Sequence, residues 1–176
     1  DLGILYIPFL ICVLMGSTNG VNLTDGLDGL AAGVTFFVVI ALGAVCFMTK
    51  HYNLIIFCGS LAGACVGFLV FNRHPARVFM GDTGSMAIGG GVAAVAALCQ
   101  AEIALVIIGG VYVLETLSVA AQVVSYQTTG KRILLMAPLH HHYELRGWPE
   151  TKVVYFFWAL SFVFTVIGLL GFRHMG

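Results

Sequence analysis

LAAGVTFFVVIALGAVCFM, residues 30–48, contains no charged side chain and a single hydroxyl group. A helix needs about 20 mostly apolar residues to cross a hydrocarbon layer about 30 Å thick, and this stretch has that length. Backbone N–H and C=O groups find no partner in lipid, so a single spanning segment has to be helical. Residues 30–48 therefore predict a transmembrane helix.

Five more apolar runs flank this stretch, and the first of them is short. They cover residues 2–16, 54–71, 84–99, 103–125 and 153–172. None alternates at every second residue, as the strands of a membrane barrel would. The sequence predicts an all-α fold, a polytopic transmembrane helix bundle of about six spans, with residues 1–176 forming a single domain.

The overall composition excludes several classes of protein. Hydrophobic residues make up 60% of the chain and charged residues only 9%, against about 25% charged in soluble domains. Eight basic and eight acidic side chains cancel, so no basic surface indicates a nucleic-acid partner. The five cysteines lie in apolar runs without C-x-x-C spacing, which favours packing over a disulfide framework or a metal site.

The six spans place the connecting segments alternately on two sides of a membrane. Segments 17–29, 72–83 and 126–152 share one side, and segments 49–53 and 100–102 share the other with the C-terminus. Six of the eight basic residues lie on the first side: Arg73, Arg77, Lys131, Arg132, Arg146 and Lys152. Because cytoplasmic loops carry an excess of Lys and Arg, the first side is predicted to be cytoplasmic.

Two features within the spans need an explanation. Glycines recur at positions 59, 63 and 67 and are consecutive at positions 89–91, a pattern typical of closely packed membrane helices. Glu115 is an acid in the middle of a predicted span, and such residues usually face other protein groups. It either joins two helices or faces the functional site.

The first two loops on the predicted cytoplasmic side each combine acids with glycines. In the first, Asp25 either caps the next helix together with Asp28 or belongs to a ligand site. In the second, Asp82 stands between Gly81 and Gly84 and is either a helix cap or a ligand for Mg²⁺ on a phosphate. In both loops the glycines and the nearby charges favour the ligand site.

The third loop carries three consecutive histidines, residues 140–142. Their spacing is too short for the usual zinc motifs, but imidazoles donate to phosphate oxygens and exchange protons near neutral pH. Three loops on one side thus supply acids, glycines, cations and imidazoles. The combination favours phosphoryl transfer between a nucleotide or phosphate ligand and a lipid at the membrane surface.

Four motifs stand out in the chain: NGVNLTDGLDG at 19–29, FNRHPARVFMGDTGS at 71–85, ETLSV at 115–119 and APLHHHYELRGW at 137–148. Together they closely resemble the polyprenyl-phosphate N-acetylhexosamine-1-phosphate transferases. The unbroken histidine triplet followed by Tyr143 and Glu144 resembles the branch with a muramoyl-pentapeptide donor. That resemblance implies transfer of phospho-N-acetylmuramoyl-pentapeptide from its UDP carrier to undecaprenyl phosphate, which gives lipid I and UMP in peptidoglycan synthesis.

The resemblance also implies roles for individual residues and a requirement for Mg²⁺. Asp82 would be the metal ligand, and Phe79 would stack on the uracil base, with Asn72 and Asp28 holding the uridine. The implied catalytic residues are Asp82, Asp25, His141 and His142. The implied substrate-binding residues are Asn22, Asp28, Asn72, Phe79, Gln122 and His140.

The family places further chemistry in an N-terminal half that carries two adjacent aspartates, and the sequence contains no Asp-Asp pair. Family members have about ten spans, so we expect this chain to be the C-terminal portion of a longer protein and inactive alone. We expect a multi-pass protein of the bacterial inner membrane, surrounded by membrane lipids, in which two copies pair. The alternatives are a transferase with an N-acetylglucosamine donor and a polytopic transporter or lipid-binding protein.

Overall fold

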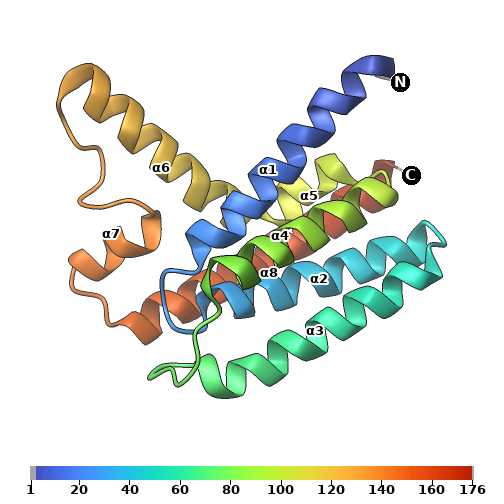
Figure 1. Ribbon diagram of the computed structural model, residues 1–176, viewed down its shortest axis with the longest axis horizontal. Coiled ribbons are helices and arrows are strands. Elements are labelled where there is room, and N and C mark those ends of the chain that lie inside the picture. Colours follow the sequence, from blue (N-terminus) through green and yellow to red (C-terminus); the bar gives the residue numbers. More distant parts are fainter. Residues whose placement is uncertain (1–2, 176) are drawn as a thin grey trace.

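The computed structural model of the chain describes residues 3–175, and within them every regular element is a helix (Figure 1). The elements are η1 (Gly3–Leu5), α1 (Tyr6–Thr24), α2 (Leu30–Met48), α3 (Tyr52–Asn72), α4 (Gly81–Leu98), α5 (Glu102–Ile108), α6 (Gly110–Thr129), α7 (Leu139–Leu145) and α8 (Glu150–Met175). The predicted all-α fold is confirmed, and α2 covers the predicted span without a shift at either end.

Four of the described helices, α1, α2, α3 and α8, are long and apolar enough to cross a membrane, and α5 with α6 makes a fifth if the bent pair is one span. The sequence predicts six. The missing one, predicted at residues 84–99, lies in α4, which has Asp82 in its first turn and contains three consecutive glycines. These residues lower its mean hydropathy, but α4 still packs along α1 and α2.

The centre of the bundle is α2, which contacts α3, α4 and α8. In α2, 67% of the spanning window is buried, against 11% in α1 and 17% in α3. The buried side chains are mainly small or β-branched, such as Ala31, Val34 and Val38. Their size lets neighbouring helices approach closely, so the most apolar stretch of the sequence also forms the core.

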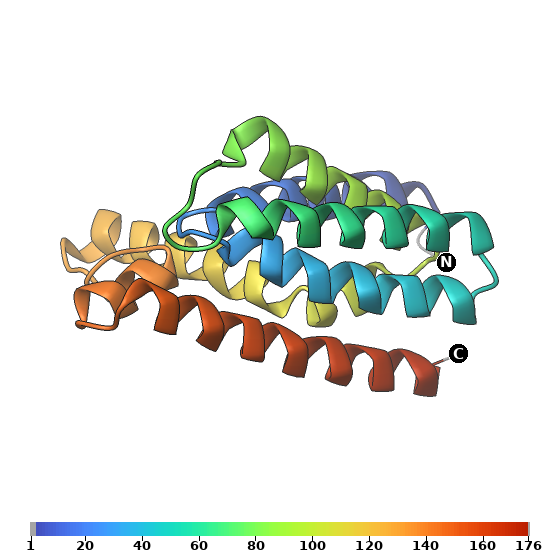
Figure 2. The same cartoon turned by 90° about the horizontal axis from the view of Figure 1, so that it is seen from below.

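The two ends of the bundle differ in the way that the sequence predicts. The α2–α3 and α4–α5 turns lie at the same end as both termini, whereas loops 25–29 and 73–80 and helix α7 lie at the opposite end (Figures 1 and 2). We call this second end the loop end. It collects the segments in which the sequence places the functional side chains.

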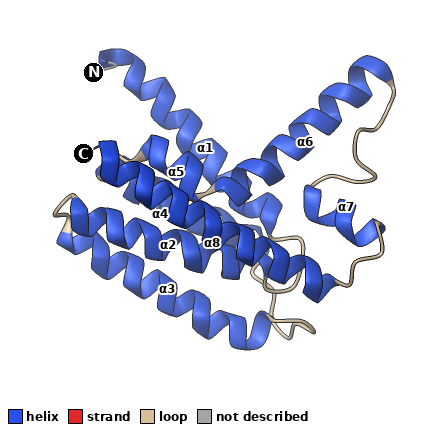
Figure 3. Ribbon diagram, turned by 180° about the vertical axis from the view of Figure 1, so that it is seen from behind, coloured by secondary structure: helices blue, strands red, loops and turns tan. Residues whose placement is uncertain are grey.

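The chain bends by 80° between α5 and α6. As a result the C-terminal half of α6 projects away from the other helices, and the chain returns through an extended segment to α7 (Figure 3). Glu115 is the last fully buried residue of α6, and most side chains beyond it are half-buried or exposed. The position of α7 therefore depends on contacts made after this return.

The predicted role of the glycines is confirmed for one group, whereas the other group contacts no other helix among the described residues. Gly89 lies against the backbone of Ser17 and Thr18, and the Ser17 hydroxyl donates to the Gly89 carbonyl at 2.8 Å. A Cβ at Gly59, Gly63 or Gly67, by contrast, would meet no described atom within 4 Å. Helix α3 turns that stripe outward because its packed face carries Cys58, Ala62 and Cys65.

Replacing Gly89 with Ala should destabilise the α1–α4 contact, because the new Cβ would lie 2.6 Å from the Ser17 carbonyl oxygen. Overpacking of this kind costs about 1–3 kcal/mol. Gly59→Ala is the matched control, and it should be neutral or stabilising by about 0.5–1 kcal/mol, since alanine favours a helix more than glycine does. Thermal unfolding in detergent measures both, and equal shifts would contradict the assigned packing.

Candidate active site

The last turn of α1 and the first turn of α4 bring a group of polar side chains together. The Asn22 side-chain amide donates to Oδ1 of Asp82 and to Oγ of Ser85, both at 3.0 Å. Asp25 is the C-cap residue of α1 and interacts with Asp82 and with the backbone N–H of Gly81. The sequence predicts Asn22, Asp25 and Asp82 in one pocket, and the structure brings them together.

The carboxyl group of Asp25 is electrostatically strained. Burial, and then the negative charge of Asp82, raises the pKa of Asp25 from 3.8 to about 6, while the hydrogen bond from Gly81 works in the opposite direction. A divalent cation between the two carboxylates would remove this repulsion. Mg²⁺ takes one or two carboxylates and completes its shell with water and phosphate oxygens, so the donor set fits the expected metal.

Neither acid caps a helix in the way that the sequence allows as an alternative. Helix α2 starts after Gly29, which adopts a left-handed conformation with φ of 78°, and no side chain caps it. Asp25 belongs instead to the end of α1, which extends to Thr24. Asp82 lies inside the first turn of α4, where the positive end of the helix dipole favours its charge.

Asn72 is buried and connects two loops. Its Oδ1 accepts the N–H of Gly29 at 3.0 Å, and its Nδ2 donates to the carbonyl of Val78 at 2.9 Å. Asn72 therefore has a structural role, because both ends of its amide bind protein backbone, and its predicted contact with uridine stays a prediction. Phe79, next to Val78, has 75% of its surface exposed, so its ring is free to stack on a planar ligand.

Asp28, His74 and Glu150 form the one cluster of three potential metal ligands among the described residues. His74 Nδ1 lies 3.3 Å from Asp28 Oδ2 and 3.0 Å from Glu150 Oε2. Each carboxylate also accepts a backbone N–H, from Ala76 at 2.9 Å and from Asp28 at 2.8 Å. These contacts hold both loops against the start of α8.

The three consecutive histidines have three different environments. His140 is fully buried, with Nδ1 at 3.2 Å from Oε2 of the equally buried Glu115. His141 lies 2.6 Å from the Glu144 carboxylate, and Nδ1 of His142 accepts the N–H of Leu135 at 3.1 Å. Burial leaves His140 no surface for the predicted substrate contact. Of the two roles open for Glu115, the structure shows the contact between helices.

Gln122 also holds protein backbone. Its Oε1 accepts the N–H groups of Ile133 and Leu134 at 3.0 Å, and its Nε2 donates to the Leu134 carbonyl at 2.9 Å. These bonds fix the segment that returns from α6 to α7. Gln122 therefore shapes the site at the point where the sequence predicts a substrate contact.

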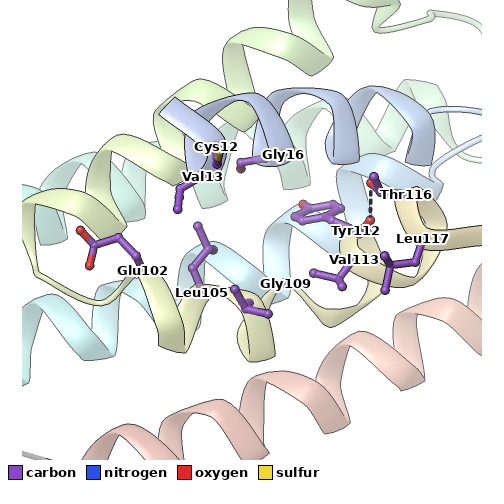
Figure 4. A pocket seen from close by; sticks show the side chains of 12 residues that line it. Cys12, Val13, Gly16, Glu102, Leu105, Gly109, Tyr112, Val113, Thr116 and Leu117 are labelled. Carbon is purple, nitrogen blue, oxygen red and sulfur yellow. Dashed lines mark hydrogen bonds between the residues drawn. The ribbon is translucent and has the colours of Figure 1, made fainter. Parts of the chain in front are cut away.

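An apolar cavity of about 270 Å³ lies between α1 and the α5–α6 bend (Figure 4). Its lining is mostly apolar and includes Val13, Leu105 and Leu117, together with Glu102, whose carboxylate accepts the hydroxyl of Tyr6. It lies along the membrane-spanning helices rather than among the acids of the loop end. A hydrocarbon chain suits such a lining, whereas a charged group does not.

Sequence reasoning missed His74 and Glu150 as members of the site. Ser85 lies in the second of the four motifs, and because it follows Asp82 by three residues, helical spacing places both on one face. Glu150 contacts the backbone of Asp28 across 122 positions of the chain, and no local signal predicts that contact. The loop end as a whole can hold a divalent cation, present an exposed aromatic ring and place imidazoles nearby.

Comparison with known proteins gives one family and a uniform set of relatives. Residues 1–101 match glycosyl transferase family 4. The chain is 57% identical over 159 residues to the phospho-N-acetylmuramoyl-pentapeptide-transferase of Desulforamulus reducens. This match covers 90% of the chain and 48% of that protein. The proteins of the same name from Heliobacterium modesticaldum and Geobacillus sp. are 55% and 56% identical, with 97% and 96% of the chain and 53% and 52% of those proteins covered. The chain thus spans about half the length of these relatives.

Replacing Asp25 with Asn should make stability less dependent on pH. The pKa of Asp25 is about 6 in the fold against an ordinary 3.8, so the folded wild type binds more protons between these values and loses stability as pH rises through them. The midpoint of the variant should exceed that of the wild type by a margin that grows with pH and then levels off above about pH 6. Thermal unfolding in magnesium-free buffer measures it, and a margin independent of pH would contradict the assignment.

Proposed function

Because the chain belongs to glycosyl transferase family 4, we propose that it is part of an enzyme that transfers phospho-N-acetylmuramoyl-pentapeptide from its UDP-linked donor to undecaprenyl phosphate. The products are lipid I and UMP. The observation that carries the proposal is the Asn22, Asp25 and Asp82 group at one end of an apolar bundle. A water-soluble nucleotide and a membrane-bound acceptor can meet only at such an end.

The reaction joins two anions, so charge has to be neutralised. An oxygen of the acceptor phosphate forms a bond to the β-phosphorus of the nucleotide, and the bond from that phosphorus to the bridging oxygen breaks as UMP leaves. Positioning and electrostatic stabilisation contribute most of the rate in such transfers. Mg²⁺, held by Asp82 with Asp25, would neutralise phosphate charge when bound.

The chain's own side chains would divide the remaining work. Phe79 offers its exposed ring to the uracil base, and the backbone held by Asn72 and Asp28 shapes the place where the uridine sits. His141 and His142 lie on α7, where their imidazoles would hold sugar or phosphate oxygens. These groups orient the donor, and orientation lowers the barrier by removing the entropy cost of assembly.

The surroundings of the site support a lipid acceptor. The apolar cavity beside α1 suits a segment of an isoprenoid chain (Figure 4). The predicted excess of basic residues on the side of the loop end favours a cytoplasmic orientation in the bacterial inner membrane. Pairing of two copies in that membrane stays a prediction.

Replacing Asp82 with Asn in the complete protein should reduce UMP release by about 100-fold or more, the loss typical when a key electrostatic group is removed. The assay uses the UDP-linked muramoyl-pentapeptide, undecaprenyl phosphate and a Mg²⁺ titration. Ser60→Ala is the control, because Ser60 is exposed on α3 and bonds only to Ile56 of its own helix.

Near-normal turnover of Asp82→Asn at ordinary Mg²⁺ would contradict the metal assignment alone. Absence of UMP release from the complete wild-type protein would contradict the proposed function. Release with UDP-N-acetylglucosamine as donor would point to the alternative transferase.

A further inference from the structure

Helix α7 cannot hold its own position. It has seven residues, Leu139–Leu145, and a helix of that length is unstable alone in water. The segment that leads to it returns from the projecting end of α6, and most of its residues are exposed (Figure 3). Because α7 carries His141 and His142, its anchors decide where these imidazoles lie.

The C-terminal part of α7 has an aromatic anchor. The ring of Tyr143 lies 5.0 Å from the ring of Trp148 and 6.2 Å from that of Phe157 in α8. Aromatic packing of this kind fixes the end of the helix against α8. It leaves the N-terminal half of α7 to be held by something else.

The N-terminal anchor is His140, which contacts Glu115 near the base of α6. Nδ1 of His140 and Oε2 of Glu115 are 3.2 Å apart, and both side chains are 0% exposed. Among the described residues, the polar atoms of these two side chains have no other partner, and their mutual contact is bent away from ideal hydrogen-bond geometry. Each side chain therefore depends on the other for compensation of its buried polar atoms.

Besides Glu115, the His140 ring lies close to Gly26 in the first loop and to the ring of His141. A methyl group at Gly26 would overlap the ring near Nε2, so the imidazole lies directly on the turn that follows Asp25. The ring of His141 is 4.2 Å away. One imidazole thus joins α6, the first loop and the histidine helix.

We propose that Glu115 is a positioning residue: by fixing the His140 ring, it holds α7 against the turn at Asp25–Gly26. The consequence for catalysis rests on the proposed function, whereas the docking of α7 does not. The uridine side of the site is held separately, since Asn72 binds Gly29 and Val78. Loss of Glu115 should therefore misplace the histidines without weakening the binding of the nucleotide.

The test compares three variants of the complete protein in detergent: Glu115→Leu, Glu115→Gln and Thr35→Val. Thr35 supplies the matched control, because its buried hydroxyl lies 2.8 Å from the Tyr112 hydroxyl of α6. Thr35→Val removes the contact with the Tyr112 hydroxyl, a buried polar contact of α6 that does not involve His140. Hydrogen exchange of residues 137–148 reports docking, and kcat and KM for the UDP-linked donor report catalysis.

For Glu115→Leu we expect hydrogen exchange in residues 137–148 to become at least about tenfold faster and kcat to fall at least about tenfold. The KM for the donor should stay within about threefold of the wild-type value, and exchange in α3 should be unchanged. Glu115→Gln, whose amide oxygen still accepts a hydrogen bond, should show smaller changes in both the exchange of residues 137–148 and kcat. Thr35→Val should leave both within about twofold.

Wild-type exchange in 137–148 for Glu115→Leu would overturn the proposal, as would a rise in KM at unchanged kcat. If Glu115→Leu does not fold, Glu115→Gln decides: exchange faster than in Thr35→Val supports the proposal, and equal exchange overturns it. If the wild type transfers nothing, the proposed function fails, and exchange still tests the Glu115 contact.

Discussion

A hydrocarbon layer gives no hydrogen-bond partner to a polar group, and the arrangement of this chain follows from that constraint. The spanning segments become helices, their side chains are apolar, and polar side chains gather where the helices end. Polar side chains that stay inside lie next to one another, as Thr35 does with Tyr112 and Glu115 with His140. The site lies at the loop end because a charged site within the apolar part would lose its solvation.

At the loop end water satisfies polar groups, and the loops need other contacts to keep one conformation. Side chains solve it by bonding the backbone of other segments: Asn72 joins Gly29 to Val78, and Gln122 holds Leu134. Side-chain amides with both ends satisfied make rigid links. Residues that the sequence assigns to the substrate thus first build the surface that the substrate meets, and their replacement would change shape and binding together.

The sequence predicts what depends on local hydropathy and misses what depends on distant contacts. The span at residues 30–48 coincides with α2 because 19 apolar residues decide it alone. The predicted first loop, residues 17–29, is too long, because Asn19 and Asn22 are polar yet lie in α1, which continues to Thr24. The burial of His140 follows from the 80° bend before α6, and the contact of Glu150 with Asp28 crosses most of the chain. Neither leaves a local pattern.

Among the described acids of the loop end, Asp25 and Asp82 differ from the others in their partners. Asp28 and Glu150 share His74, and Glu144 has His141, whereas Asp25 faces the like charge of Asp82. Burial, and then the charge of Asp82, raises the pKa of Asp25 to about 6, and the hydrogen bond from Gly81 offsets this only in part. Positive charge between the two carboxylates would make this arrangement more favourable. The same repulsion that weakens the fold therefore strengthens the binding of a cation at the place where the phosphates would meet.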